Sequence, residues 1–215
     1  MSQVSRQMTT QGDVVAPTRR LTLTESRSLL DVGLLVLRLG VGFELFAHGA
    51  QKFGLFGGTV DLSGKHVSGV AAINLQADTL LTFTGFDHTV ALSWLLTFTE
   101  LGGGLLLMVG LLTPLAASAV IGDMFVLIGL GWQAGWFGNA AVQTGYEFDV
   151  VILAAAAAIS LAGPGRYSAD GALKWKLSGV PWGVAGIVLG LAVGLFVLQV
   201  FGPGFGGLDL TPPGK

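Results

Sequence analysis

The segment from Leu37 to Gly58, LRLGVGFELFAHGAQKFGLFGG, has the apolar and glycine-rich composition of a membrane span. It also carries four ionisable side chains: Arg38, Glu44, His48 and Lys52. Such groups are costly inside a bilayer, so they usually face the interior of a helical bundle or a polar cavity. The segment therefore predicts a membrane helix that packs against other helices and contributes to a buried polar site.

The whole chain has the composition of a membrane protein. Of its 215 residues, 52% are hydrophobic and 11% are charged, and the mean hydropathy is +0.72. A soluble domain has about 25% charged residues, so this chain has too few charges to cover a water-facing surface. The net charge of −2 argues against a nucleic-acid partner. The chain contains no cysteine, which excludes disulfide and thiol chemistry within it.

Five segments are apolar enough to cross a bilayer, which takes about 20 residues of helix. They cover about 29–49, 89–112, 115–132, 148–163 and 180–201. The connection from 50 to 88 is the longest, and connections of that length often carry structure or function of their own. We expect a short amphipathic helix or a hairpin cap in it, resting on the outer surface.

Lysine and arginine orient the predicted spans. With five spans, seven of these residues fall on one side of the membrane and three on the other. By the positive-inside rule the N-terminus is cytoplasmic and the C-terminus lies outside. The fold class is therefore an all-α membrane protein. We expect a flexible cytoplasmic tail at 1–28, a four-helix membrane core at 29–170, an inner linker and fifth transmembrane helix at 171–202, and a short outer tail at 203–215.

Three charged residues in different spans form a first candidate site. Counted along the spans at 1.5 Å per residue, Arg38, Glu100 and Asp123 lie at similar depth near the midplane. One cation and two acids at one depth predict a buried polar cluster. The alternative is that Arg38 and one acid form an ion pair that serves packing alone.

A second candidate site lies toward the outer face. Glu44, His48 and Lys52 follow an i, i+4, i+8 spacing, which places them along one stripe of the first helix. Glu147 and Asp149 open the fourth span on the same side. These two acids could instead serve the helix N-terminus, where the macrodipole favours negative charge. The stripe is a candidate ligand or quinone site, a proton relay or a metal ligand pair. We assign no metal site and no catalytic residue.

The ordered motifs RLGVGFELFAHGAQKFGLFGG, TELGGGLLLMVGLLTPLAA and LAGPGRYSAD resemble those of the DoxX family of bacterial integral membrane proteins. The resemblance extends from about residue 29 to 170. The matching positions are Arg38, Gly40, Phe46, His48, Gly49, Lys52, Phe53 and Gly54; Glu100, Gly102, Gly103, Gly110, Leu111 and Thr113; and Gly163, Pro164, Gly165, Arg166, Tyr167, Ser168 and Asp170. The long outer loop and the fifth span depart from the minimal family pattern.

The resemblance implies a four-helix core in the bacterial plasma membrane and an association with oxidoreductases. Similar proteins are linked to a terminal quinol oxidase, to thiosulfate:quinone oxidation, and to a complex with superoxide dismutase in oxidative-stress defence. We therefore expect an accessory or anchoring subunit of a membrane redox or respiratory complex, more a non-catalytic subunit than an enzyme. It would contact lipid and other redox proteins and carry no covalently bound cofactor.

Two alternatives remain at this point. One is a quinone-reactive subunit of a quinone oxidoreductase, in which Glu44, His48 and Glu100 handle protons. A quinone pocket needs few residues and leaves no sharp motif. The other is a small proton-linked transporter built on the cluster of Arg38, Glu100 and Asp123, because ionisable residues within a membrane often mark transport paths.

Overall fold

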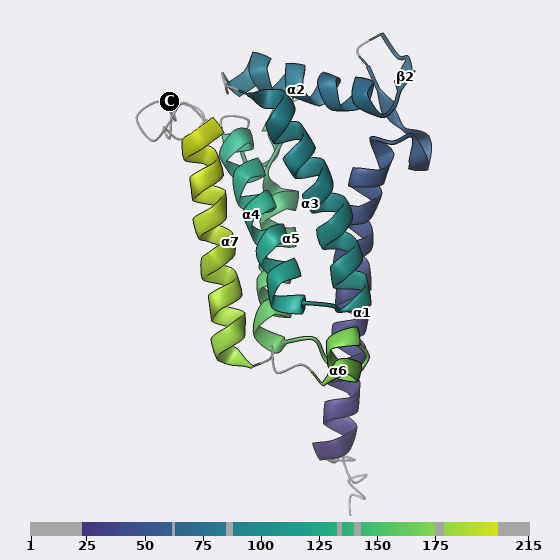
Figure 1. Ribbon diagram of the computed structural model, residues 1–215, viewed down its shortest axis with the longest axis vertical. Coiled ribbons are helices and arrows are strands. Elements are labelled where there is room, and N and C mark those ends of the chain that lie inside the picture. The colour runs from purple at the N-terminus through teal and green to yellow at the C-terminus, as the bar shows by residue number, and fades with distance from the viewer. Residues whose placement is uncertain are drawn as a thin grey trace, which may run out of the picture.

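The structure, a computed structural model, describes residues 23–61, 63–84, 88–132, 135–139, 143–174 and 179–201. Its described part is mostly helical (Figure 1). The long helices that pack side by side as a bundle are α1 (Leu23–Gln51), α3 (Thr89–Val109), α4 (Thr113–Gly131), α5 (Glu147–Ala162) and α7 (Val180–Phe201). Helix α2 (Val70–Thr84) lies across one end of the bundle, and the short α6 (Ala169–Leu173) lies near the other. We call these the α2 end and the α6 end.

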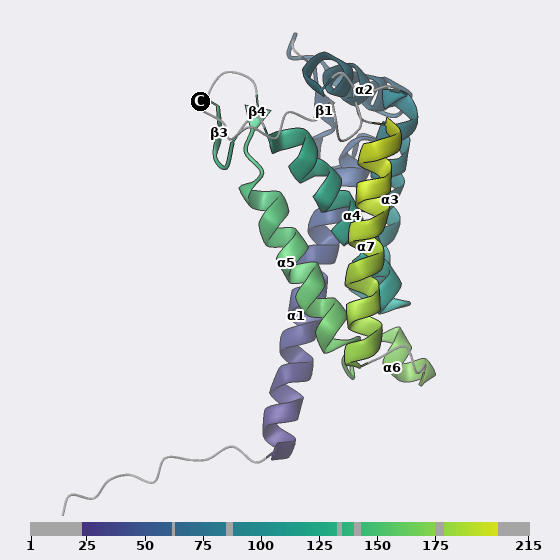
Figure 2. The same ribbon diagram turned by 90° about the vertical axis from the view of Figure 1, so that its left-hand side faces the viewer.

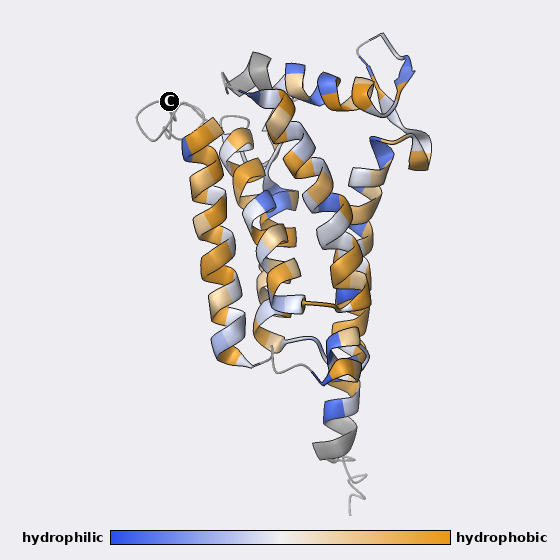
Figure 3. Cartoon of the chain, viewed as in Figure 1, coloured by the Kyte–Doolittle hydropathy of each residue, from blue (hydrophilic) through white to orange (hydrophobic). Residues whose placement is uncertain are grey.

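Three of the described helices are long and apolar enough to cross a membrane: α3, α4 and α7. Figure 3 shows α7 apolar along most of its length. Its bounds coincide with the predicted span at 180–201. Helix α5 has 16 residues, fewer than the usual length of a spanning helix. The structure therefore supports an all-α membrane protein, while the count of four core spans plus a fifth stays a prediction.

Helix α1 is longer than the sequence predicted. It begins at Leu23, so residues 23–28, expected in the flexible tail, are helical, and it ends at Gln51. Figure 1 shows that it continues past the other helices at the α6 end. The prediction placed the start of the helix where apolar residues begin. Backbone hydrogen bonds, however, extend a helix through polar residues as well. The rest of the predicted N-terminal tail, 1–22, and the predicted outer tail, 203–215, lie outside the described residues.

The connection between α1 and α3 contains both a hairpin and a short helix, the two alternatives that the sequence left open. A 3-10 turn, η1 (Leu55–Gly57), precedes an antiparallel hairpin of β1 (Thr59–Val60) and β2 (His66–Val67), and α2 follows. In the hairpin turn the Asp61 carboxylate accepts hydrogen bonds from the Ser63 hydroxyl and from the N–H groups of Ser63 and Lys65. Hydrogen bonds from Ser63 and Lys65 lower the pKa of Asp61. A second hairpin, β3 (Gly138–Asn139) with β4 (Gln143–Thr144), precedes α5.

Glycines set the register of the two closest helix pairs. A Cβ atom on Gly104 of α3 would lie 2.5 Å from the carbonyl oxygen of Gly42 in α1, and one on Gly190 of α7 would lie 2.5 Å from the carbonyl oxygen of Ser118 in α4. The backbones therefore touch, as small residues allow in membrane bundles. Farther along α1, Gly49 lies against Leu101 of α3. The last turn of α1 is thus level with the middle of α3.

The apolar core lies between these helices. Its buried members come from α1, α3, α4 and α5: Val41, Leu45, Leu107, Ala116, Ala117, Val120, Ile121, Met124, Ile152, Ala156 and Ile159. Helix α7 packs on α4 and α5, and α1 packs on α3 and α5. The polar residues within the bundle therefore interrupt a continuous apolar core, and each of them needs a physical account.

A polar site inside the helical bundle

Arg38 lies at the α6 end of the bundle, where the turn between α3 and α4 meets the connection between α5 and α6. Its side chain is fully buried, and Nη2 donates a hydrogen bond to the backbone carbonyl of Tyr167. Gly110 lies against the guanidinium, since any Cβ atom there would overlap Nη1. Gly110 has φ +68°, a backbone conformation that glycine adopts readily. The close approach and the backbone conformation together explain a glycine at this position.

Asp170 holds the same loops together. Its carboxylate accepts hydrogen bonds at 2.8 Å from the N–H groups of Leu112 and Thr113 and from the Thr113 hydroxyl, at the N-terminus of α4. Its own N–H donates to the carbonyl of Gly110. Asp170 is also the acid whose charge acts on Arg38. Three of the sequence motifs therefore meet at one buried structural site.

The predicted cluster of Arg38, Glu100 and Asp123 does not form. Arg38 is bound to the loops of the α6 end, whereas Glu100 pairs with Lys52. The depth estimate failed because it assumed that all spans start at the same level. Helix α1 instead extends beyond its neighbours at the α6 end, so Arg38 is level with Gly110, at the end of α3.

Glu100 and Lys52 form an ion pair near the middle of α3. The Lys52 Nζ atom lies 2.6 Å from Glu100 Oε2, with side chains only 12% and 9% exposed. The offset of α1 brings Lys52, predicted in the outer stripe, to this level. Because each charge has the other as its partner, the pair can persist in a poorly solvated setting.

Asp123 lies close to this pair but makes no bond to it. The side chain is 4% exposed, and neither carboxylate oxygen has a hydrogen-bond partner among the described residues. The charges of Glu100, Lys52 and Asp149 all act on it. A buried carboxyl group without a partner is costly unless it binds a proton or meets a donor. Beside the Lys52–Glu100 pair, Asp123 therefore has unused hydrogen-bonding capacity.

The remaining residues of the predicted stripe lie on the α1 and α5 side of the bundle. His48 Nε2 is 3.1 Å from Glu44 Oε1, and these side chains are 55% and 43% exposed. The ring centroid of His48 is 6.5 Å from that of Phe148 in α5, and its charge acts on Asp149. One buried oxygen of Glu147 has no hydrogen-bond partner among the described residues. His48 of the predicted stripe thus lies near Phe148 and Asp149 of α5, whereas Lys52 lies apart with Glu100.

The structure groups the candidate residues differently from the sequence. A central group consists of Lys52, Glu100 and Asp123, and a lateral group consists of Glu44, His48 and Asp149. Both contain groups that can accept or donate protons at mid-bundle depth. Within the described ranges, no three His, Asp or Glu side chains are arranged to hold a metal ion.

Two residues with a clear place in these sites were not among the predicted site residues. Thr99, which precedes Glu100, lines a cavity beside Asp123. Asp170 was noted only as part of a motif. Its position just after Ser168, which caps α6 by accepting from the N–H of Gly171, signals a local turn. Its bonds to α4 are long-range, and no local pattern reveals them.

Comparison with known families supports the resemblance seen in the motifs. Residues 33–137 match the model of the DoxX family. The match covers α1 from Gly33 onward, the connection between α1 and α3, and α3 and α4, and it stops before the segment 163–170 that also carries the resemblance. Comparisons with curated proteins and with solved structures gave no match.

Proposed function

We propose that this chain, whose residues 33–137 form a DoxX domain, is an integral membrane subunit that anchors or assists a membrane redox complex. The DoxX family implies a membrane protein, and its members are often associated with redox or stress functions. The proposal adds a role for this chain: it is a non-catalytic subunit that presents a polar surface within the membrane to a partner enzyme.

The exposed pair of Glu44 and His48 carries this proposal. Both residues lie near the level of the Lys52–Glu100 ion pair, in the middle of α3, yet their side chains are about half exposed. The surface around them is apolar, with Phe43 51% and Phe148 47% exposed. Polar groups that face hydrocarbon cost several kcal/mol unless protein or water covers them. A partner subunit that covers this surface would remove that cost.

The arrangement in the membrane follows from the same proposal. The chain would cross the bacterial plasma membrane five times, with the α6 end cytoplasmic and the α2 end outside, as the distribution of lysine and arginine favours. Helix α7 would add a fifth span to the four-helix core. Its outward side chains, among them Val188 at 60% and Phe196 at 64% exposed, would face lipid.

Native purification tests the proposal. The full chain is extracted gently from its own membranes, and mass spectrometry identifies the proteins that co-elute. We expect respiratory or antioxidant enzymes, superoxide dismutase among the candidates, in fixed ratio. His48→Ala should reduce their yield while the chain itself stays at wild-type level. Val188→Ala, on an exposed face of α7, is the matched control and should leave the yield unchanged. Elution of the chain alone would contradict the proposal.

A quinone-reactive subunit is the second candidate, and the unpartnered carboxyl group of Asp123 favours it. Together with Lys52 and Glu100, Asp123 could exchange protons with a quinone head group as it is reduced or oxidised. A lipid extract of the purified chain tests this, since a quinone site should retain quinone. The proton-linked transporter is separated from both by flux: only a transporter would move protons or solute when reconstituted alone in liposomes.

A further inference from the structure

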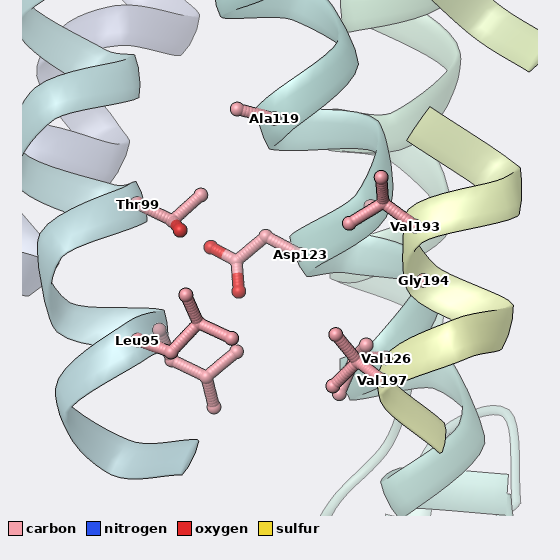
Figure 4. Close-up of a pocket in the computed structure, with 10 residues that line it drawn as sticks. Leu95, Thr99, Ala119, Asp123, Val126, Val193, Gly194 and Val197 are labelled. Atoms are coloured by element: carbon pink, nitrogen blue, oxygen red, sulfur yellow. The ribbon is translucent and has the colours of Figure 1, made fainter. Parts of the chain in front are cut away.

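A small cavity lies beside Asp123, between α3, α4 and α7 (Figure 4). Its volume is about 120 Å³. Most of its lining is apolar or small: Leu95, Leu96, Ala119, Gly122, Val126, Val193, Gly194 and Val197. Two lining residues, Asp123 and Thr99, bring polar side chains. The cavity is therefore an apolar space with its polar groups gathered in one place.

Asp123 is directed toward this space. Figure 4 shows its carboxyl group extending from α4 toward α3, with Thr99 and Leu95 on that side and Val193 and Val197 on α7. Both oxygens are buried and lack a hydrogen-bond partner among the described residues. Leu95 and Val193, at 43% and 47% exposed, flank it at the surface where the bundle would face lipid. A ligand in the cavity would thus meet a free acceptor and could enter from the bilayer.

We propose that this cavity binds a single aromatic ring carrying a hydroxyl group, delivered from the membrane. The size fits, because an apolar cavity of about 150 Å³ accommodates benzene. The chemistry fits as well, because the ring would lie among aliphatic side chains while its hydroxyl donates to Asp123. A phenolic hydroxyl is neutral and reaches this depth at lower cost than a charged ammonium group.

This inference deepens the quinone-reactive candidate, on which the biological identity of the ring rests. A reduced quinone head group is a hydroxylated ring of this kind. Binding of the ring itself stands on the cavity and on Asp123, so it can be tested with a simple phenol. No electron transfer is required for the test.

The experiment uses the full chain in phosphatidylcholine nanodiscs and a phenol bearing a photoreactive diazirine. After illumination, mass spectrometry maps the labelled residues. We expect saturable labelling of the cavity segments of α3, α4 and α7. Competition compares 4-butylphenol with its methyl ether, 4-butylanisole, which has the same shape but no donor. The phenol should compete at a concentration about fivefold lower or more, as for one net hydrogen bond.

Two substitutions sharpen the test. Asp123→Leu should abolish the difference between phenol and ether. Val193→Phe should fill the cavity and abolish labelling, whereas Val188→Phe, a matched change on an exposed part of α7 outside the cavity lining, should leave it unchanged. Equal competition by phenol and ether in the wild-type chain would overturn the proposal, and so would labelling that survives Val193→Phe. The wild-type comparison decides even if a variant fails to fold.

The result separates this inference from the subunit proposal. Specific phenol binding by a chain that purifies alone would support the cavity site and contradict the redox-subunit role. Co-elution with redox enzymes and no preference for the phenol over the ether would support the redox-subunit role and contradict the cavity site.

Discussion

Replacing Asp170 with alanine should destabilise the α6 end of the bundle. The carboxylate accepts three hydrogen bonds at 2.8 Å from Leu112 and Thr113, and it is 1% exposed. Its charge also acts on the buried guanidinium of Arg38. Asp170→Ala removes these interactions at once and leaves their donors buried.

The magnitude follows from the number of donors that lose their partner. A buried donor left unsatisfied costs about 1–3 kcal/mol, and the carboxylate of Asp170 serves three donors. Allowing for relaxation, Asp170→Ala should lower the free energy of unfolding by about 4 kcal/mol or more. Asp61→Ala is the matched control. That carboxylate also accepts three hydrogen bonds, but it lies in an exposed turn, so its loss should change stability little.

The assay is reversible unfolding in mixed micelles titrated with sodium dodecyl sulfate, followed by circular dichroism. A double-mutant cycle of Arg38→Leu and Asp170→Ala should give a coupling energy of about 1 kcal/mol or more. A second cycle of Arg38→Leu and Glu100→Gln should be additive within about 0.5 kcal/mol. Stronger coupling of Arg38 to Glu100 than to Asp170 would refute the assignment of Arg38 to the α6 end.

Three further predictions concern a glycine contact, two charged residues and the hairpin turn. Gly104→Ala should destabilise the contact between α1 and α3 by about 1–3 kcal/mol, because its Cβ would lie 2.5 Å from a carbonyl oxygen. Gly102→Ala is the control and should leave stability unchanged, because no atom lies within 4 Å of its Cβ position; thermal unfolding in detergent compares the two variants. Arg38→Leu should lower the amount of protein in the membrane fraction, while His48→Ala should leave the amount unchanged on immunoblots; an equal decrease for both would contradict this division. Hydrogen bonds lower the pKa of Asp61, so its carboxylate should stabilise the hairpin turn fully above the ordinary carboxyl pKa. This stabilisation should be lost as pH falls through the lowered pKa, which amide hydrogen exchange of the turn can follow. Loss of protection in the turn already near pH 5 would count against this reading.

Hydropathy and helix stop signals were sufficient to predict the apolar helices. Helix α7 has the predicted bounds because its apolar run is uninterrupted and glycine and proline follow it. Helices α3 and α4 begin and end within a few residues of the prediction, since the turn at Thr113-Pro114 separates them. These features are local, and local features can be read from one sequence.

The offset of α1 was not predictable in the same way. Hydropathy gives the length of a span but not its level relative to its neighbours, and that level depends on the contact between Gly42 and Gly104. The offset decides the site: it moves Arg38 to the α6 end and brings Lys52 to Glu100. The prediction therefore grouped Arg38 with Glu100 and Asp123, whereas Asp170 is the acid whose charge acts on Arg38 in the structure.

We propose that another redox protein covers the polar surface at Glu44 and His48. A photo-crosslinking amino acid in place of His48, introduced in living cells, tests it most directly, with the same substitution at Val188 as the lipid-facing control. We expect position 48 to form an adduct with a redox protein that position 188 does not form. Adducts from position 48 with lipid alone, or only with a second copy of this chain, would contradict it.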